Sequence, residues 1–244
     1  MSETQPKMIY NNPRFMVKQY DWDVFIGPAA GEPVADYTFT DLEGIEVKLS
    51  DFKGKWVVLE TGSATCSMYT KNIPDMDEVI ADFPDVEFLL IYVREAHPGE
   101  RLHQHRSFEE KTSAAKMLAG RYRERRRVLV DSLDGAYHRS HGAMPNIMYV
   151  IRPDGIVHYR CNWTTTEGLR EALSDRDSFH TVENADMHKL KASRGIYTSM
   201  RTMWTGGAVA LWDFFKAGPQ LAKRHKLVDD YYREHGKFKQ QPSR

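Results

Sequence analysis

The sequence predicts an α/β fold with a central mixed sheet flanked by helices, and three patterns support that prediction. Residues 57–59 are consecutive apolar residues, which is typical of a strand buried on both faces. Residues 87–93 predict a second strand, which is continuously apolar after Glu87. Between them, Ile73–Asp82 has helical spacing, and Pro74 is tolerated in a first helical turn. Two such strands joined by a helix predict a parallel, right-handed βαβ unit.

The other elements are predicted from turn residues and helix boundary residues. Further strands are expected at 36–40, 47–49, 128–130, 146–151 and 156–160, and further helices at 108–120 and 166–173. The residues 41–44 and 153–155 suit the turns of two hairpins. Ser107 is expected to cap the helix at 108–120, with Glu110 completing a capping box.

The chain divides into three parts by composition. Residues 1–30 contain Asn-Pro and Gly-Pro breakers and predict an irregular arm, whose aromatic residues around Tyr20 pack on the main domain. Residues 31–181 form the α/β domain, and residues 182–244 form a helical extension. In the extension, the apolar segment 208–215 is expected to end before Gly218-Pro219. It favours a helix packed on the α/β domain over a homodimer contact or membrane-surface docking.

The charge balance argues against a nucleic-acid partner. Lys and Arg together number 34, and Asp and Glu also number 34, so no overall field attracts the protein to nucleic acid or an anionic membrane. The arginine-rich run Arg121–Arg127 is the exception, and such a run is usually a solvated helix end.

Cysteine usage and hydropathy predict a cytoplasmic protein. The two cysteines, Cys66 and Cys161, are too few for a disulfide framework, which favours a reducing compartment. Residues 1–7 are polar and lack the apolar core of a signal peptide. No stretch approaches the roughly 20 apolar residues that a transmembrane helix needs, so no transmembrane segment is expected.

Cys66 is the candidate nucleophile. The strand at 57–59 breaks at Gly62, and the chain then reaches Cys66 just before a helical pattern. At such a strand-to-helix turn, the helix dipole and free backbone N–H groups favour a thiolate. The alternative is a buried structural cysteine, which is a common place for a lone cysteine.

Acid–base residues are expected beside Cys66. Glu95 and His97 follow the next parallel strand, and the carboxyl ends of neighbouring strands open onto one crevice. A histidine there can exchange a proton with the thiol or a leaving group, and Glu95 can orient it. His105, in the loop before the helix at 108–120, is a second candidate.

These motifs resemble those of the iodothyronine deiodinases, selenoenzymes that reductively remove iodine from an aromatic ring. The motifs are Gly62-Ser63-Ala64-Thr65-Cys66, Ile91-Tyr92 with Glu95-Ala96-His97, and Gln104-His105-Arg106-Ser107 with Ser113-Ala114-Ala115. Residues 32–55 also resemble the opening of thioredoxin-like redoxins, which implies a thioredoxin-like fold.

The resemblance implies a set of site residues. Cys66 takes the position of the selenocysteine, with Ser63, Thr65, Tyr92, Glu95, His97 and His105 on catalytic positions. Arg106, Met144 and Pro145 are expected to bind substrate, since Met144-Pro145 falls near the cis-proline position of thioredoxin folds. The sequence departs from the family at Ala64, at Ser67-Met68-Tyr69 and at Arg94. The retained motifs imply that the chemistry is shared with the family. The departures imply that thyroid hormone is not the expected substrate.

The expected function is therefore reductive dehalogenation of an iodophenol-like small molecule by Cys66. The alternative is a one-cysteine, peroxiredoxin-like thiol peroxidase, and a non-enzymatic binding module is a third class. Either chemistry needs an external thiol, thioredoxin or a low-molecular-weight thiol, and neither needs a tightly bound cofactor or a metal. Cys161 can resolve an oxidised Cys66 only if their Cα atoms lie within about 7 Å.

Overall fold

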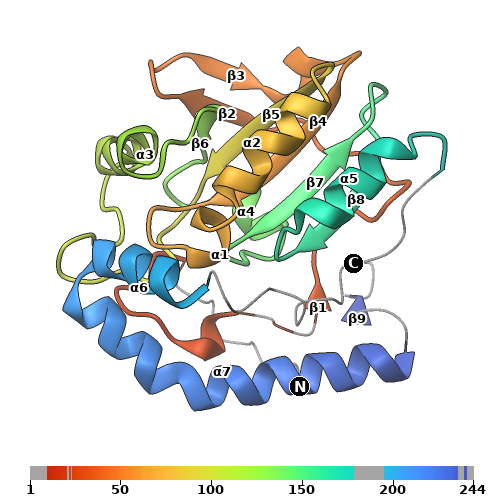
Figure 1. The fold of residues 1–244 in the computed structure, drawn as a ribbon. Helices are drawn as coiled ribbons and strands as arrows, with labels where there is room; N and C mark the ends of the chain where they lie inside the picture. Colours follow the sequence, from red (N-terminus) through yellow and green to blue (C-terminus); the bar gives the residue numbers. More distant parts are fainter. Residues whose placement is uncertain (1–9, 21, 23, 179–194, 236–238, 241–244) are drawn as a thin grey trace, which may run out of the picture.

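A mixed sheet forms the centre of the computed structural model, which describes residues 10–20, 22, 24–178, 195–235 and 239–240 (Figure 1). The order of its seven strands is β3-β2-β6-β5-β4-β7-β8. The strands are β2 Thr38–Asp41, β3 Glu46–Lys48, β4 Trp56–Gly62, β5 Val86–Tyr92, β6 Arg127–Val130, β7 Ile147–Ile151 and β8 Val157–Asn162. The predicted α/β class with a mixed sheet is confirmed.

The predicted βαβ unit forms the middle of this sheet. β4 and β5 pair in parallel over their full length, with Leu59 opposite Leu89. The connecting helix α2 spans Ile73–Asp82, with Pro74 in its first turn. β6 continues the parallel pairing next to β5, whereas β7 pairs antiparallel with β4 on the other side. The carboxyl ends of β4 and β5 therefore lie at the same edge of the sheet.

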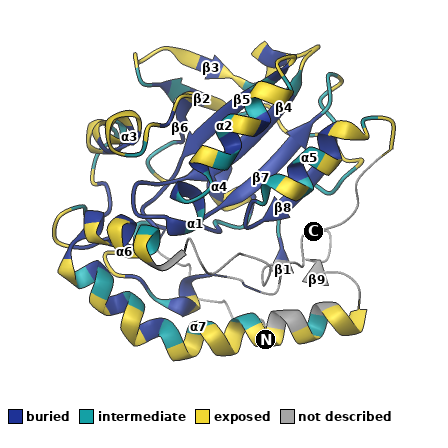
Figure 2. Ribbon diagram, in the orientation of Figure 1, coloured by how far each residue is buried: buried dark blue, intermediate teal, exposed yellow. Residues whose placement is uncertain are grey.

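Alternating side chains of the central strands enter two cores. Val57 and Leu59 point into one cluster, and Val58 points into the other, because successive strand residues face opposite sides. The helices α2 and α5 (Thr166–Ser174) cover the Val58 side, as Figure 1 shows. Figure 2 shows the central strands buried on both faces, which explains their continuously apolar sequences.

The two hairpins lie where the sequence predicts them, and helix α3 spans Phe108–Tyr122. The Ser107 hydroxyl accepts a hydrogen bond from the Glu110 N–H, which confirms the predicted N-cap. The capping box is not reciprocal, because the Glu110 carboxylate accepts from the N–H of Arg106, one residue earlier. The short helices α1 (Ser67–Thr70) and α4 (Ala136–Ser140), and the 3-10 helix η2 (Leu49–Phe52), were not expected from the sequence.

The arm covers the α/β domain with aromatic side chains, as predicted. Its described part holds the 3-10 helix η1 (Val17–Gln19) and β1 (Val24–Phe25), which pairs with β9 (Lys239–Gln240). Tyr20, Trp22 and Phe25 are buried in the Val57 cluster. The Trp22 ring stacks on Trp163, which follows β8, with 5.7 Å between ring centroids.

The C-terminal part forms two helices, α6 (Gly195–Gly206) and α7 (Ala208–His235). In Figure 1 the arm and α7 lie beneath the carboxyl ends of β4 and β5. The expected end before Gly218-Pro219 is wrong, since α7 continues through Pro219. Pro219 and Phe215 are both exposed, so water can solvate the carbonyl that loses its helical hydrogen bond. In the described residues, the helices lack the combined length and hydrophobicity to cross a bilayer.

Candidate active site

Cys66 lies where the central strand passes into a helix, as predicted. It is the N-cap residue of α1, and its side chain makes no capping hydrogen bond, although the backbone N–H groups of Met68 and Tyr69 act to lower the pKa of its thiol. Gly62 is required at the end of β4, because a Cβ atom there would lie 2.6 Å from the Tyr69 ring. The N–H groups of the helix terminus favour a thiolate, as predicted, but burial outweighs them in this conformation. Cys66 is 2% exposed, and burial raises the pKa of its thiol to about 12 despite the two N–H groups.

Glu95 is the centre of a hydrogen-bond network beside Cys66. Its Oε2 accepts from the Thr65 N–H at 3.0 Å and from the Thr65 hydroxyl at 2.6 Å, and its Oε1 accepts from the Tyr92 hydroxyl. Burial raises the pKa of this carboxyl, but His105, Thr65 and Tyr92 outweigh it and hold the pKa below its ordinary value. Glu95 is therefore a buried anion. It is hydrogen-bonded to Thr65, the residue that precedes the nucleophile.

His105 lies against this anion. Its Nε2 is 3.3 Å from Glu95 Oε1, at an angle that does not complete an aligned hydrogen bond, and both side chains are buried. Gln104 fixes the two loops together, since its amide accepts from the Glu95 N–H and donates to the Glu95 carbonyl. The Glu95 carboxylate and the Gln104 amide can thus fix the position of the His105 loop and orient its ring.

His97 lies in an apolar part of the same site. Its backbone N–H donates to the Thr65 hydroxyl at 3.0 Å. Its ring packs between Phe15 of the arm, at 4.3 Å, and Phe214 of α7, at 5.6 Å. Burial lowers the pKa of His97 to about 4, so the ring is neutral at pH 7. Its Nδ1 is buried and has no hydrogen-bond partner in the structure, which leaves it available to a bound molecule.

The remaining predicted residues divide into two groups. Ser63 lies in the network, where its hydroxyl accepts from the Ala96 N–H. Arg106 is exposed at the start of α3, outside these hydrogen bonds. Met144 is buried, and its carbonyl lies 2.6 Å from His138 Nε2. The peptide bond before Pro145 is trans, so this proline lacks the cis conformation that the thioredoxin comparison suggested.

The arm closes the site through residues that the sequence reasoning did not select. Arg94 donates to the carbonyl of Tyr10 at 2.5 Å, and its guanidinium lies 5.0 Å from the Tyr10 ring and 5.1 Å from the Tyr20 ring. Tyr20 is close enough to Cys66 for the two groups to interact electrostatically. Arg94 is one of the departures from the family pattern, and that departure was the available signal for its role in holding the arm.

Cys161 lies on β8. Like Cys66, it is a free, buried thiol. It pairs across the sheet with Met148, which in turn lies opposite Glu60 of β4. Among the described residues no group of three or more histidine, cysteine and acidic side chains is arranged to hold a metal ion.

The order of the strands, with a cysteine following the central strand, defines a thioredoxin-like fold. The sequence model of the iodothyronine deiodinase family matches residues 3–166, and the chain belongs to that family. Thyroxine 5-deiodinase of Sparus aurata is 25% identical over 125 residues, 46% of each chain. Type II iodothyronine deiodinase of Fundulus heteroclitus is 32% identical over 90 residues, 31% of this chain and 34% of the relative.

Two further comparisons extend beyond the deiodinases. A putative chloroplastic glutathione peroxidase 7 of Arabidopsis thaliana is 27% identical over 81 residues, 33% of this chain and 35% of that protein. A solved structure of an uncharacterized conserved protein from Geobacillus kaustophilus matches with a TM-score of 0.52 and 16% identity, over 66% of this chain and 89% of that one. The latter supports the fold alone. The chain spans less than half the length of the curated relatives cited here.

Proposed function

We propose that this protein is a thiol-dependent oxidoreductase that removes halogen from an iodophenol-like aromatic substrate, with Cys66 as the nucleophile. The observation that carries the proposal is the buried chain from Thr65 through Glu95 to His105 beside the thiol. A nucleophile, an acid–base group and a carboxylate that orients it are the parts that the reaction needs. Membership of the deiodinase family supports the same chemistry.

The proposed reaction starts when the Cys66 thiolate attacks the iodine atom along the carbon–iodine bond. A sulfur–iodine bond forms, the carbon–iodine bond breaks, and the electron pair stays on the ring carbon. The imidazolium of His105, held by Glu95, supplies the proton that this carbon takes up. Sulfur is oxidised to a sulfenyl iodide, and the aromatic substrate is reduced.

An external thiol then restores the enzyme. It attacks the Cys66 sulfur, forms a mixed disulfide and displaces iodide, and a second thiol releases the disulfide and regenerates Cys66. The sum is one aryl iodide and two thiols converted to the dehalogenated arene, a disulfide, iodide and a proton. Thioredoxin or a low-molecular-weight thiol can fill this role, and a cytoplasmic location would supply it.

Substrate access requires the arm to move. Cys66 is buried in the described conformation, where Tyr20 of the arm interacts with it electrostatically, and its thiol is protonated there. Opening would expose the sulfur to water, remove the main cause of its raised pKa and leave the two backbone N–H groups to stabilise the thiolate. The unpartnered Nδ1 of His97 would then be a hydrogen-bonding group for the phenol hydroxyl.

The test is iodide release from 3,5-diiodophenol with dithiothreitol as the reductant. Wild type and Cys161→Ser should release iodide, whereas Cys66→Ser should not. Cys161→Ser is the matched control, because both cysteines are free and buried. Iodide release by Cys66→Ser at the wild-type rate would exclude Cys66 as the nucleophile.

A thiol peroxidase is the second candidate, supported by the likeness to the Arabidopsis thaliana glutathione peroxidase. In that reaction the Cys66 thiolate attacks a peroxide oxygen, the O–O bond breaks, and a sulfenic acid and an alcohol or water form. Two external thiols then reduce the sulfenic acid to the thiol, with release of water and a disulfide. Peroxide consumption measured beside iodide release separates the two, since turnover of peroxide alone would replace the dehalogenase proposal.

A further inference from the structure

A basic cavity lies beside α1, the short helix that follows Cys66. Its volume is about 610 Å³, and it lies between α1, the end of α3 and α6. Four cationic side chains line it: Lys71, Arg121, Arg123 and Arg201. Among the described residues its lining contains no acidic side chain, and the rings of Tyr122 and Tyr197 add aromatic surface. We call this site the basic cavity.

The arginine-rich run divides between structural ion pairs and this cavity. Arg126 is buried between Glu60 and Glu124, and Arg127 pairs with Asp41 at 2.7 Å. Arg125 lies 3.9 Å from Asp77. The two remaining arginines, at 121 and 123, have no carboxylate partner within the described residues, and both line the basic cavity. The run is a solvated helix end at its exposed arginines, as expected, whereas Arg126 is buried.

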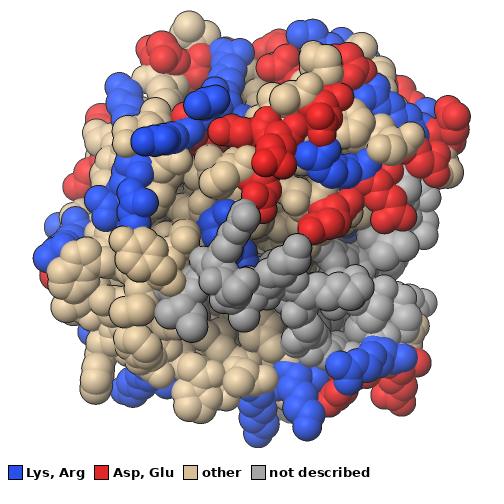
Figure 3. All heavy atoms as spheres, viewed as in Figure 1, with Lys and Arg blue, Asp and Glu red and all other residues tan. Residues whose placement is uncertain are grey.

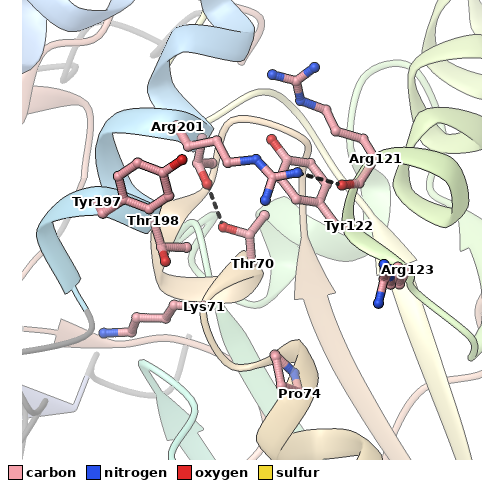
Figure 4. A pocket seen from close by; sticks show the side chains of 10 residues that line it. Thr70, Lys71, Pro74, Arg121, Tyr122, Arg123, Tyr197, Thr198 and Arg201 are labelled. Atoms are coloured by element: carbon pink, nitrogen blue, oxygen red, sulfur yellow. Dashed lines mark hydrogen bonds between the residues drawn. The ribbon is translucent and has the colours of Figure 1, made fainter.

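The cationic groups are held in place around the opening. Arg201 donates to the carbonyl oxygen of Arg121 at 3.2 Å, which joins α6 to the end of α3. Figure 4 shows Arg201 reaching across beside Tyr122, with Lys71 on the Thr198 side and Arg123 on the α3 side. Arg123 has a φ of 61°, a left-handed conformation that is unfavourable for a residue other than glycine. Arg123, which has this conformation at the end of α3, is thus one of the four cationic residues that line the basic cavity.

The charges around the basic cavity are uncompensated by their surroundings. Lys71, like Arg121 and Arg123, has no carboxylate partner in the part of the chain that the structure describes, and neither has Arg201. Figure 3 shows Lys and Arg side chains gathered on the side of the face that carries α3, whereas Asp and Glu gather over α2 and α5. Like charges placed together raise each other's energy, and a bound anion would relieve that repulsion.

We propose that the basic cavity binds a small organic polyanion, a molecule with two or more phosphate or carboxylate groups. The volume falls within the range of about 300–1,000 Å³ that is usual for small-molecule sites. Arginine and lysine together suit phosphate and carboxylate oxygens, and the tyrosine rings and Pro74 suit an apolar or aromatic body. This inference does not depend on the reaction at Cys66.

The basic cavity also has a connection to the nucleophile. Lys71 is the C-cap of α1, the helix that Cys66 begins, and it interacts electrostatically with the thiol. The Thr70 hydroxyl lies 2.7 Å from that of Thr202, which fixes α1 against α6. An anion in the basic cavity would therefore act on Cys66 through Lys71, and we expect it to change the rate at which Cys66 is alkylated.

The test is calorimetric titration of the full chain with pyrophosphate and, separately, with citrate at low ionic strength. Wild type should bind at least one probe saturably, and the tighter probe identifies phosphate or carboxylate as the preferred group. Arg121→Gln/Arg201→Gln should weaken binding by about tenfold or more, since two charge-assisted contacts are lost. Arg125→Gln is the matched control, because it removes a neighbouring arginine that lies outside the lining.

Three results would overturn the proposal. They are no saturable binding of either probe, equal binding by the double variant, and an equal loss in Arg125→Gln, which would indicate general surface charge. In the first case, binding of single-stranded RNA would identify the surface as one for a polymer. Thermal unfolding of each variant without ligand establishes that the substitutions leave the fold intact.

Discussion

The hydroxyl of Thr65 donates to Glu95 over 2.6 Å, and this bond joins the residue before the nucleophile to the carboxylate that faces His105. The same hydroxyl accepts from the His97 N–H at 3.0 Å. The Thr65 side chain therefore holds the cysteine loop against His97 and against Glu95, the carboxylate that faces His105. It can do so because β4 and β5 are parallel neighbours and end at the same edge of the sheet.

Thr65→Val should lower turnover without unfolding the protein. Valine has the shape of threonine but cannot donate to Glu95 or accept from His97, and the lost bonds should cost about 1–3 kcal/mol of stability. Iodide release in the assay above should fall by about tenfold or more. Thr65→Ser keeps the hydroxyl and is the control, with activity close to wild type. Equal activity in the valine and serine variants would show that the hydroxyl has no role.

Glu95→Gln should weaken the protein in a way that depends on pH. The pKa of Glu95 is lower in the folded protein than its ordinary value of 4.5, so its carboxylate contributes stability above pH 4.5 that is lost as the pH falls through the folded pKa. The free energy of unfolding of the wild type should exceed that of Glu95→Gln by about 1–3 kcal/mol at neutral pH. Chemical denaturation of both proteins at several pH values measures the difference. A difference that stays constant below pH 4.5 would contradict an ionised Glu95.

Much of the fold is predictable because local sequence patterns determine it. Val57, Val58 and Leu59 can form only a strand covered on both sides, and the helix at Ile73–Asp82 is found at the predicted residues. The grouping of Cys66 with Glu95 was also predictable, because it needs only the rule that parallel strands end at one edge. His105 joined them through its resemblance to a family motif.

The closure of the site was not predictable, because it depends on contacts between distant parts of the chain. Phe15 and Phe214 lie about 200 residues apart in sequence and pack on the same histidine ring. Sequence reasoning placed Cys66 at a helix N-terminus and inferred a thiolate from that local feature. Burial of Cys66 reverses the inference, since desolvation outweighs the influence of the neighbouring backbone N–H groups on the pKa of the thiol.

Alkylation of Cys66 should be slow at neutral pH and should accelerate with pH. Burial raises the pKa of this thiol to about 12, so the rate with iodoacetamide should rise about tenfold for each pH unit well into the alkaline range. Because the folded pKa lies above the ordinary value of 9.0, the neutral thiol favours the folded state below pH 9, and this contribution is lost as the pH rises through 12. A rate that levels off near pH 8 would contradict the closed conformation.

The ion pair between Arg14 and Asp213 should control that alkylation rate. Arg14 donates to the Asp213 carboxylate at 2.5 Å, and the residues that follow each of them, Phe15 and Phe214, enclose His97. Arg14→Gln should release the arm from α7 and raise the rate by about fivefold, the equivalent of about 1 kcal/mol. Arg139→Gln, which removes an exposed pair with Asp134, is the control and should leave the rate unchanged. Equal rates in all three proteins would show that the pair does not hold the arm closed.

Gly62→Ala should displace the helix that carries the nucleophile. A Cβ atom at Gly62 would lie 2.6 Å from the Tyr69 ring, and Tyr69 is fixed below by a 2.6 Å hydrogen bond to Glu124. The ring is fully buried and cannot move aside, so the variant should lose about 1–3 kcal/mol of stability and most of its iodide release. Gly120→Ala is the matched control, because nothing lies within 4 Å of a Cβ at that position in α3. It should gain up to about 1 kcal/mol from the higher helix propensity of alanine and keep its activity. If Gly62→Ala also retained full stability and activity, the close packing of Tyr69 would not determine where Cys66 lies.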